Sequence, residues 1–305
     1  MPKEIFGPKY PFLKKEEWLR FSELDLLLEE FIKLGVEKVR LTGGEPLLRP
    51  GLSKYINGLN RYPEIKDIAL TTNGLLLSNQ AQELKDAGLH RITVSLDAMD
   101  DKLVGEINGK GLGTKRILEG IKKAQQVGLG VKINTVVEKG VNEQEILPLL
   151  EYFEPLGIPV RFIEFMDVGN HNQWKLDRVF SAEEILLMVQ SRYPVYPIDT
   201  SATFQVARKY QYGEKGEMGI ITSVTQPFCQ NCTRARISAD GQLYTCLFAQ
   251  KGVNLKQFLR SPNFSREGLL ELLISCWQQR KDRYSEERAT QSNQKKKVEM
   301  SYIGG

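Results

Sequence analysis

Three cysteines in the second half of the chain have the spacing of metal ligands. Cys229 and Cys232 are separated by two residues, and Cys246 follows after a stretch that reads as a hairpin. Two cysteines at this spacing can face one metal centre, and a third on a following strand can complete the same site. Arg234 and Arg236 come just after the pair and would project to one side of an extended segment. Because guanidinium groups bind phosphates well, the array predicts a metal centre beside an anion site.

The ligand count helps to decide which kind of metal centre this is. Structural zinc needs four ligands, and we interpret the distant Cys276 as a core residue of an apolar helical run. His90 and His171 fall in other segments of the chain. Three thiolates can hold an iron–sulfur cluster and leave one iron open to another ligand. The alternative for the two arginines is ordinary surface charge.

The first part of the chain alternates strand-like and helical patterns. Strands are expected at residues 36–41, 65–70, 91–96, 131–137 and 160–165. Helices are expected at residues 22–34, 79–87, 114–127 and 143–154. Repeated units of this kind indicate parallel strands joined by crossovers, with chemistry at the carboxyl ends of the strands. We expect residues 1–166 to form this domain and residues 167–305 to form a smaller α+β domain that carries the cysteines.

Polar and glycine-rich motifs follow three of the predicted strands. They are Gly43-Gly44-Glu45-Pro46, Thr71-Thr72-Asn73-Gly74 and Ser95-Leu96-Asp97. Glycine has no Cβ, so the first motif would let a ligand approach the backbone closely. Taken singly, each motif can equally be a tight turn or a helix cap.

Three cations interrupt predicted apolar strands: Arg40, Lys132 and Arg161. A charged side chain is rarely buried without a partner, so cations that face the inside of a barrel predict an anionic guest. The alternative is an internal ion pair with Glu45 or Glu164.

Composition narrows the class of protein further. A chain of 305 residues with 41% hydrophobic residues, 26% charged residues and a net charge of +4 suits a globular protein with a small anionic ligand. A nucleic-acid track would call for a strongly basic face. No segment approaches the ~20 apolar residues that cross a membrane, and no secretory N-terminal pattern is evident, so we expect a cytoplasmic protein.

In order along the chain, these motifs resemble the GTP 3′,8-cyclase family, radical S-adenosylmethionine enzymes that begin molybdenum cofactor biosynthesis. The resemblance covers essentially the whole chain, and its most specific parts are Cys229-x2-Cys232-x-Arg234-x-Arg236 and the terminal Gly304-Gly305. It implies an α/β fold, a TIM-like (βα)6 radical S-adenosylmethionine barrel whose mouth is closed by the smaller C-terminal domain.

The resemblance also implies a role for each matching position. S-adenosylmethionine would be contacted by Gly44, Ser95 and Met166, with Arg161 as a neighbour. GTP would be held by Arg40, Thr71, Lys132, Arg234 and Arg236. The tail residues Gly304 and Gly305 would reach the GTP site, and the alternative for them is a disordered terminus. A 4Fe–4S cluster, whose open iron meets guanine, would be bound by Cys229, Cys232 and Cys246. The implied partners are GTP, S-adenosylmethionine and a reductant protein; a homodimer stays open, and neither nucleic acid nor membrane is expected.

One family motif is not found in the sequence. The family carries Cys-x3-Cys-x2-Cys for a second 4Fe–4S cluster that cleaves S-adenosylmethionine, commonly followed by Met-Pro, and here Met1-Pro2 opens the chain. We expect the first barrel unit, these cysteines and an upstream GTP-contacting arginine to be missing, through a start assigned too far downstream or a fragment. Such a form should not generate the 5′-deoxyadenosyl radical. The alternatives are a non-catalytic protein that binds GTP and an iron–sulfur cluster, and a radical S-adenosylmethionine enzyme with an auxiliary cluster that acts on a peptide.

Overall fold

The computed structural model describes residues 13–169, 172–199, 206–227, 229, 232–287, 298–299 and 302. Its larger sheet has the strand order β1-β2-β3-β4-β5-β8-β7-β6, and its smaller sheet has the order β11-β10-β9. The strands of the larger sheet are β1 (Lys38–Leu41), β2 (Asp67–Thr72), β3 (Arg91–Ser95), β4 (Gly130–Val137), β5 (Val160–Glu164), β6 (Val195–Pro197), β7 (Arg208–Tyr212) and β8 (Gly216–Ile221). Strands β1 to β5 and β8 run parallel, while β7 and β6 are antiparallel additions.

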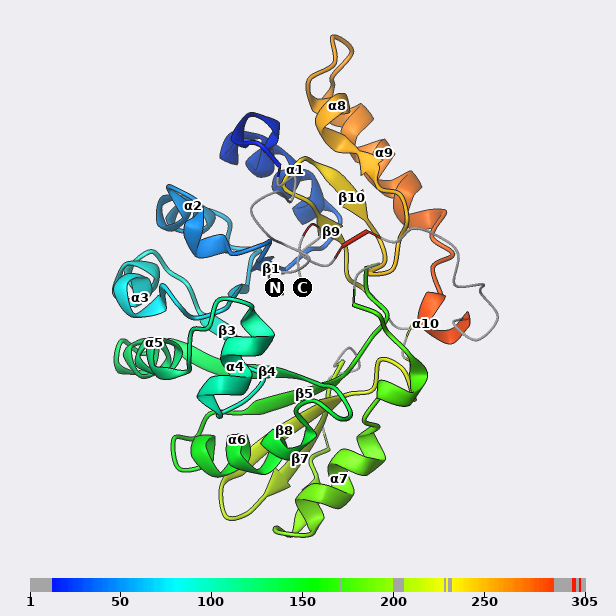
Figure 1. The fold of residues 1–305 in the computed structure, drawn as a ribbon. Helices are drawn as coiled ribbons and strands as arrows, with labels where there is room; N and C mark the ends of the chain where they lie inside the picture. The colour runs from blue at the N-terminus through cyan, green and yellow to red at the C-terminus, as the bar shows by residue number, and fades with distance from the viewer. Residues whose placement is uncertain are drawn as a thin grey trace.

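Helices connect the parallel strands along the outer side of the curved sheet (Figure 1). They are α2 (Leu52–Leu59), α3 (Leu77–Asp86), α5 (Lys115–Gln126), α6 (Ile146–Phe153) and α7 (Ala182–Gln190), while α1 (Phe21–Lys33) precedes β1 and α4 (Asp101–Asn108) comes before α5 in the connection from β3 to β4. Short 3-10 turns lie at Lys15–Glu17, Pro46–Leu48, Glu143–Glu145 and Leu176–Arg178. The alternation of parallel strands and helices confirms the predicted α/β class and the barrel-type array of strand–helix units.

Each parallel strand separates an apolar face from a polar face, because successive side chains in a strand point to opposite sides. Ile92, Ile133 and Phe162 are fully buried in the main hydrophobic core. The neighbouring positions on the other face of these strands include Thr93 and Lys132. The inner face of the curved sheet is therefore polar, although the strands are apolar overall.

The predicted elements are present with shifted ends. Gly35 has a φ of 83°, and the N–H of Val36 donates to the carbonyl of Phe31. Residues 35 and 36 therefore belong to the C-terminal cap of α1, and the first strand begins at Lys38 and not at the predicted residue 36. The sixth parallel strand, β8, comes from residues 216–221. The larger sheet thus continues past the expected domain boundary between residues 166 and 167, and that boundary stays a prediction.

A second, smaller core joins the start of the described chain to its C-terminal part. Its elements are α1, β9 (Arg236–Ile237), β10 (Gln242–Tyr244), β11 (Val253–Asn254), α8 (Leu255–Leu259) and α9 (Arg266–Gln278), with α10 (Tyr284–Glu287) following. Leu19 and Leu27 pack there against Leu243, Leu255 and Leu269.

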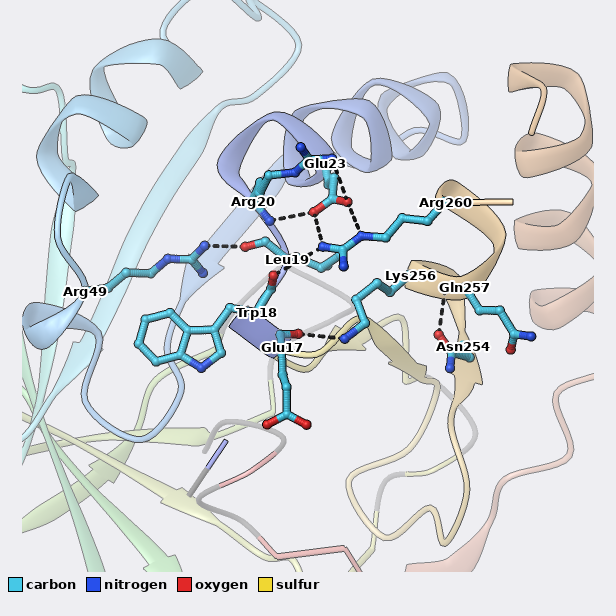
Figure 2. A network of polar contacts seen from close by, with 10 residues as sticks. All are labelled: Glu17, Trp18, Leu19, Arg20, Glu23, Arg49, Asn254, Lys256, Gln257 and Arg260. Atoms are coloured by element: carbon cyan, nitrogen blue, oxygen red, sulfur yellow. Dashed lines mark hydrogen bonds and ion pairs between the residues drawn. The ribbon is translucent and has the colours of Figure 1, made fainter. Parts of the chain in front are cut away.

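Polar contacts fasten the same junction (Figure 2). Arg260 donates from Nε to Glu23 Oε1 at 2.7 Å and from Nη2 to Glu23 Oε2 at 3.0 Å, although 237 positions separate the two residues. Lys256 Nζ donates to the carbonyl of Glu17 at 2.7 Å, and Arg49 Nη2 donates to that of Leu19 at 2.6 Å. In the described part of the chain, no helix is long and apolar enough to cross a membrane.

Candidate active site

Glu45 organises the turns that follow β1 and β2. Its Oε1 accepts from the Leu47 N–H at 3.1 Å and from the Thr72 hydroxyl at 2.7 Å, while its Oε2 accepts from the Asn73 N–H at 2.8 Å. Gly43 has a φ of 143°, which L side chains rarely adopt, so the turn requires glycine there. Gly44 is exposed on this turn, so its backbone is open to a ligand at the carboxyl end of β1.

Arg40 lies on the inner face and reaches across two neighbouring strands. Its Nη1 donates to Thr71 Oγ1 at 3.0 Å and to Thr93 Oγ1 at 3.3 Å. Burial, with the charges of Arg91 and Arg161 acting in the same direction, lowers the pKa of Arg40 to about 10. The guanidinium still carries its charge at neutral pH, so this part of the sheet is cationic.

Arg161 presents unsatisfied donors to the inner face. Its Nε and Nη2 are buried and have no hydrogen-bond partner among the residues that the structure describes. Gly219 faces it in register, and a Cβ on that glycine would lie 2.8 Å from Arg161 Cγ, so the side chain occupies space that only glycine leaves. Burial and then the charge of Arg91 lower the pKa of Arg161. Buried donors without partners are rare, and an anionic guest would satisfy these.

Lys132 adds a third cation beside Arg161. Burial lowers the pKa of Lys132, and the charges of Arg161 and Lys209 act in the same direction, against the opposing charge of Glu217. The two carboxylates that could have paired internally with the cations have other partners. Glu45 braces the turns, and the fully buried Glu164 accepts from the N–H groups of Ala182, Val224 and Thr225 and from the Thr225 hydroxyl. An ion pair with either carboxylate therefore does not explain the cationic face.

The residues predicted to contact S-adenosylmethionine lie where parallel strands end. Ser95 is the last residue of β3 and is exposed, and Met166 follows β5 with its carbonyl accepting from Asn172 Nδ2 at 2.7 Å. Close by, Asp97 Oδ1 accepts from the Val136 N–H at 2.9 Å. Burial raises the pKa of Asp97 to about 6, against the opposing effect of that hydrogen bond.

Cys229, Cys232 and Cys246 are free, partly buried thiols. The Cys232 N–H donates to the Cys229 carbonyl at 3.2 Å. Burial raises the pKa of Cys246, and the charges of Cys229 and Cys232 contribute. Among the described residues, no three His, Cys, Asp or Glu side chains converge enough to hold a single metal ion. Three cysteine thiols are the kind of donor set that iron–sulfur clusters use.

Positive charge surrounds these thiols. Burial opposes ionisation of Cys232, but the charge of Arg234 and hydrogen bonds from Arg234 and Arg280 outweigh it and lower the pKa to about 7. Burial lowers the pKa of Arg236 to about 10, with Arg234 adding to the shift and the thiols of Cys232 and Cys246 opposing it. Thiolates are the form that binds iron, so the arginines favour ligation.

Arg236 links the cysteine array to the inner face of the sheet. Beyond the effect of burial, its charge is among those that lower the pKa of Arg40. Arg236 begins β9 and pairs in register with Tyr244 of β10, two residues before Cys246. The predicted metal ligands and the predicted anion-binding cations therefore share one electrostatic region.

The structure adds some residues to the site and leaves others aside. Gly304 and Gly305 lie outside the described residues, as does His171. Thr93 belongs to no motif of the sequence, but its place two residues after Arg91 in β3 puts it on the inner face. Asn134 has a buried Oδ1 with no partner in the described part of the chain, and it pairs in register with Arg161.

Comparison with known proteins identifies the family. Residues 5–153 match the Radical SAM superfamily, and residues 158–286 match Molybdenum Cofactor Synthesis C. Over 310 residues the chain is 48% identical to the GTP 3′,8-cyclase of Staphylococcus aureus strain Mu3, covering 100% of this chain and 91% of the relative. The chain belongs to the GTP 3′,8-cyclase family. The same protein from strain Newman gives the same identity and coverage.

Solved structures show that this family member shares its fold with more distant proteins. Streptococcus suis SuiB bound to S-adenosylmethionine gives a TM-score of 0.58 at 16% identity, covering 90% of this chain and 62% of that one. SuiB bound to the precursor peptide SuiA gives 0.57 at 16% identity, covering 81% of this chain and 59% of that one. The family member thus spans less than two thirds of SuiB, and the likeness concerns the fold alone.

Proposed function

We propose that this chain acts on GTP as a GTP 3′,8-cyclase, forming (8S)-3′,8-cyclo-7,8-dihydroguanosine 5′-triphosphate in the first step of molybdenum cofactor biosynthesis. The observation that carries the proposal is the buried guanidinium of Arg161, whose Nε and Nη2 lack partners among the described residues. Arg40, Lys132 and Arg236 extend the same cationic region to the cysteine array. A ligand with several negative charges fits this region, and a triphosphate provides them.

The phosphate-binding part of the site would use side chains already held in place. Arg40 is oriented by its hydrogen bonds to Thr71 and Thr93, so little side-chain entropy is lost when it binds a phosphate. Lys132, Arg234 and Arg236 would complete the GTP contacts. Gly44, Ser95 and Met166 would contact S-adenosylmethionine, with Arg161 as a neighbour whose unsatisfied donors would also bind a phosphate of GTP.

The three cysteines would hold a 4Fe–4S cluster that offers an open iron to the guanine base. Reductive cleavage of bound S-adenosylmethionine would supply the radical that takes hydrogen from the ribose, and the electron for it would come from the second 4Fe–4S cluster, whose Cys-x3-Cys-x2-Cys ligands are not found in this sequence. The protein's part is to position the base and the ribose and to balance the phosphate charge, which is catalysis by orientation and electrostatics. The reductant protein, the homodimer and the cytoplasmic location stay predictions.

Equilibrium dialysis of the anaerobically reconstituted protein with GTP and with guanosine tests the proposal. Arg40→Met and Lys132→Met should each weaken GTP binding about 10-fold or more, because each removes a charge-assisted bond worth about 1.5–3 kcal/mol. Guanosine binding should change much less. Arg192→Met is the matched control, since this exposed arginine pairs with Glu151 at 3.7 Å on the outer surface. Unchanged GTP affinity in both inner-face variants, or no GTP binding by the wild type, would refute the proposal.

A further inference from the structure

A short segment after α9 contacts both parts of the chain that carry the cysteines. Arg280 Nη1 donates to the carbonyl of Cys232. The Arg280 side chain is only 12% exposed, its Nε lies 3.6 Å from Asp282 Oδ2, and its Cζ lies 5.0 Å from the centre of the Trp277 ring. Packing on the indole and pairing with Asp282 therefore fix the guanidinium that touches the first cysteine segment.

Asp282 carries the connection to the second cysteine segment. Its Oδ2 accepts a hydrogen bond from the hydroxyl of Thr245, the residue immediately before Cys246. Arg280 and Asp282 thus form a continuous polar chain from the Cys232 backbone to the neighbour of Cys246. Cys232 is 48 positions from Arg280 in the sequence, and Thr245 is 37 positions from Asp282, so only the fold brings these residues together.

Tyr284 adds an aromatic contact from the same segment. Its ring stacks on Phe248 with centroids 4.7 Å apart, and the Phe248 N–H donates to Cys246 Sγ at 3.4 Å. The Tyr284 hydroxyl donates to Asp167 Oδ2 at 2.5 Å, just beyond the end of β5. Residues 280–284 therefore connect the loop after β5 to both cysteine segments.

We propose that Arg280 and Asp282 are positioning residues for the iron–sulfur site. They would hold the Cys229–Cys232 segment and the Cys246 segment at the separation that one cluster needs. The inference rests on the proposed function, because it takes the three cysteines to be cluster ligands. Partners that orient the ligands of a metal centre typically change metal affinity by about 10- to 100-fold when they are removed.

Chelator competition on the anaerobically reconstituted chain measures this effect. Arg280→Met should release iron at an about 10-fold lower chelator concentration than the wild type, and the EPR signal of the reduced cluster should shift or broaden. Asp282→Asn should show a weaker form of the same change, because the amide can still accept from Thr245. Arg280→Lys keeps a charged donor and should recover part of the affinity. Lys281→Met, which removes an exposed charge from the same segment, is the matched control.

The outcomes separate this inference from the function on which it rests. A wild-type chain that binds no iron after reconstitution would overturn the proposed function. A wild type that binds iron, with Arg280→Met unchanged in both chelator resistance and EPR signal, would overturn the positioning role alone. If circular dichroism shows that Arg280→Met does not fold, Arg280→Lys and Asp282→Asn decide the question by the same two measurements.

Discussion

Replacing Glu23 with glutamine tests whether the ion pair between the buried Glu23 and the partly exposed Arg260 holds the N-terminal and C-terminal parts of the described chain together. The residue is 4% exposed, and Arg260 binds both carboxylate oxygens. That hydrogen-bonded pairing lowers the pKa of Glu23 from 4.5 to about 2, with burial opposing the shift and the Arg20 N–H assisting it. A difference of about 2.5 pKa units corresponds to ~3 kcal/mol in favour of the charged form in the folded state.

The sign of the pH dependence follows from this lowered pKa. A carboxylate with a depressed folded-state pKa stabilises the protein above its unfolded pKa and loses this contribution as pH falls toward the folded value. Glu23→Gln should therefore lower the free energy of unfolding by about 3 kcal/mol at pH 7. The difference from wild type should shrink to roughly half by pH 3.

Urea unfolding of the wild type, Glu23→Gln, Arg260→Met and the double variant measures the coupling between the two residues. Lys139→Gln is the control, because its 2.6 Å pair with Glu184 is 48% and 35% exposed and should contribute at most about 1 kcal/mol. A Glu23→Gln effect below 1 kcal/mol, or one that is the same at pH 7 and pH 3, would contradict the reasoning.

Three further predictions concern the sheet and its ends. Gly219→Ala should displace Arg161 and weaken GTP binding, because the new Cβ would lie 2.8 Å from Arg161 Cγ. Gly58→Ala in α2 is the control, and it should stabilise the helix by up to ~1 kcal/mol with no effect on GTP binding. The pKa of Asp97 is raised to about 6 by burial, so wild-type stability should fall as pH rises from 4 to 6, and urea unfolding of Asp97→Asn should show a flatter profile. Glu164→Gln should cost about 2–4 kcal/mol in urea unfolding, because the amide cannot accept all the bonds now made by Ala182, Val224 and Thr225, and proteolysis should become faster near residue 224.

The sequence predicts the repeating part of the fold well, because its signals are local. Gly35 ends the first helix by a positive φ, and the apolar run after it makes the first strand. Local patterns do not predict strand β8 as a sixth parallel strand, because Gly216 and Gly219 lower its strand propensity. Gly219 is needed for another reason, as it leaves room for Arg161 from a strand that is distant in the sequence.

The sequence predicts those site residues whose charge is unusual for their apolar neighbours in the sequence. It does not predict residues that join the site only through contacts between distant segments. Arg40 and Arg161 stand out because a cation within an apolar strand needs an explanation. Arg280 has no such signal, because it lies in a charged stretch that reads as solvated. Its contact with the Cys232 carbonyl depends on how α9 packs against α1 and β10, and local patterns carry no information about that packing.

Strand register explains why an anion would bind at one end of the inner face. Arg91 and Asp67 begin β3 and β2, and they pair through bonds of 2.5–3.1 Å. Two residues further along β3, Thr93 is level with Thr71 and Lys132, and Ser95 is level with Asn134, which in turn pairs with Arg161. Positive charge at the amino ends of β2 and β3 is thus neutralised by the Arg91–Asp67 pair, whereas the charges of Lys132 and Arg161, which are level with Thr93 and Ser95 of β3, are left for a ligand. Coulomb attraction would therefore favour a triphosphate on the side of the Arg91–Asp67 pair where the turns and the cysteine array lie.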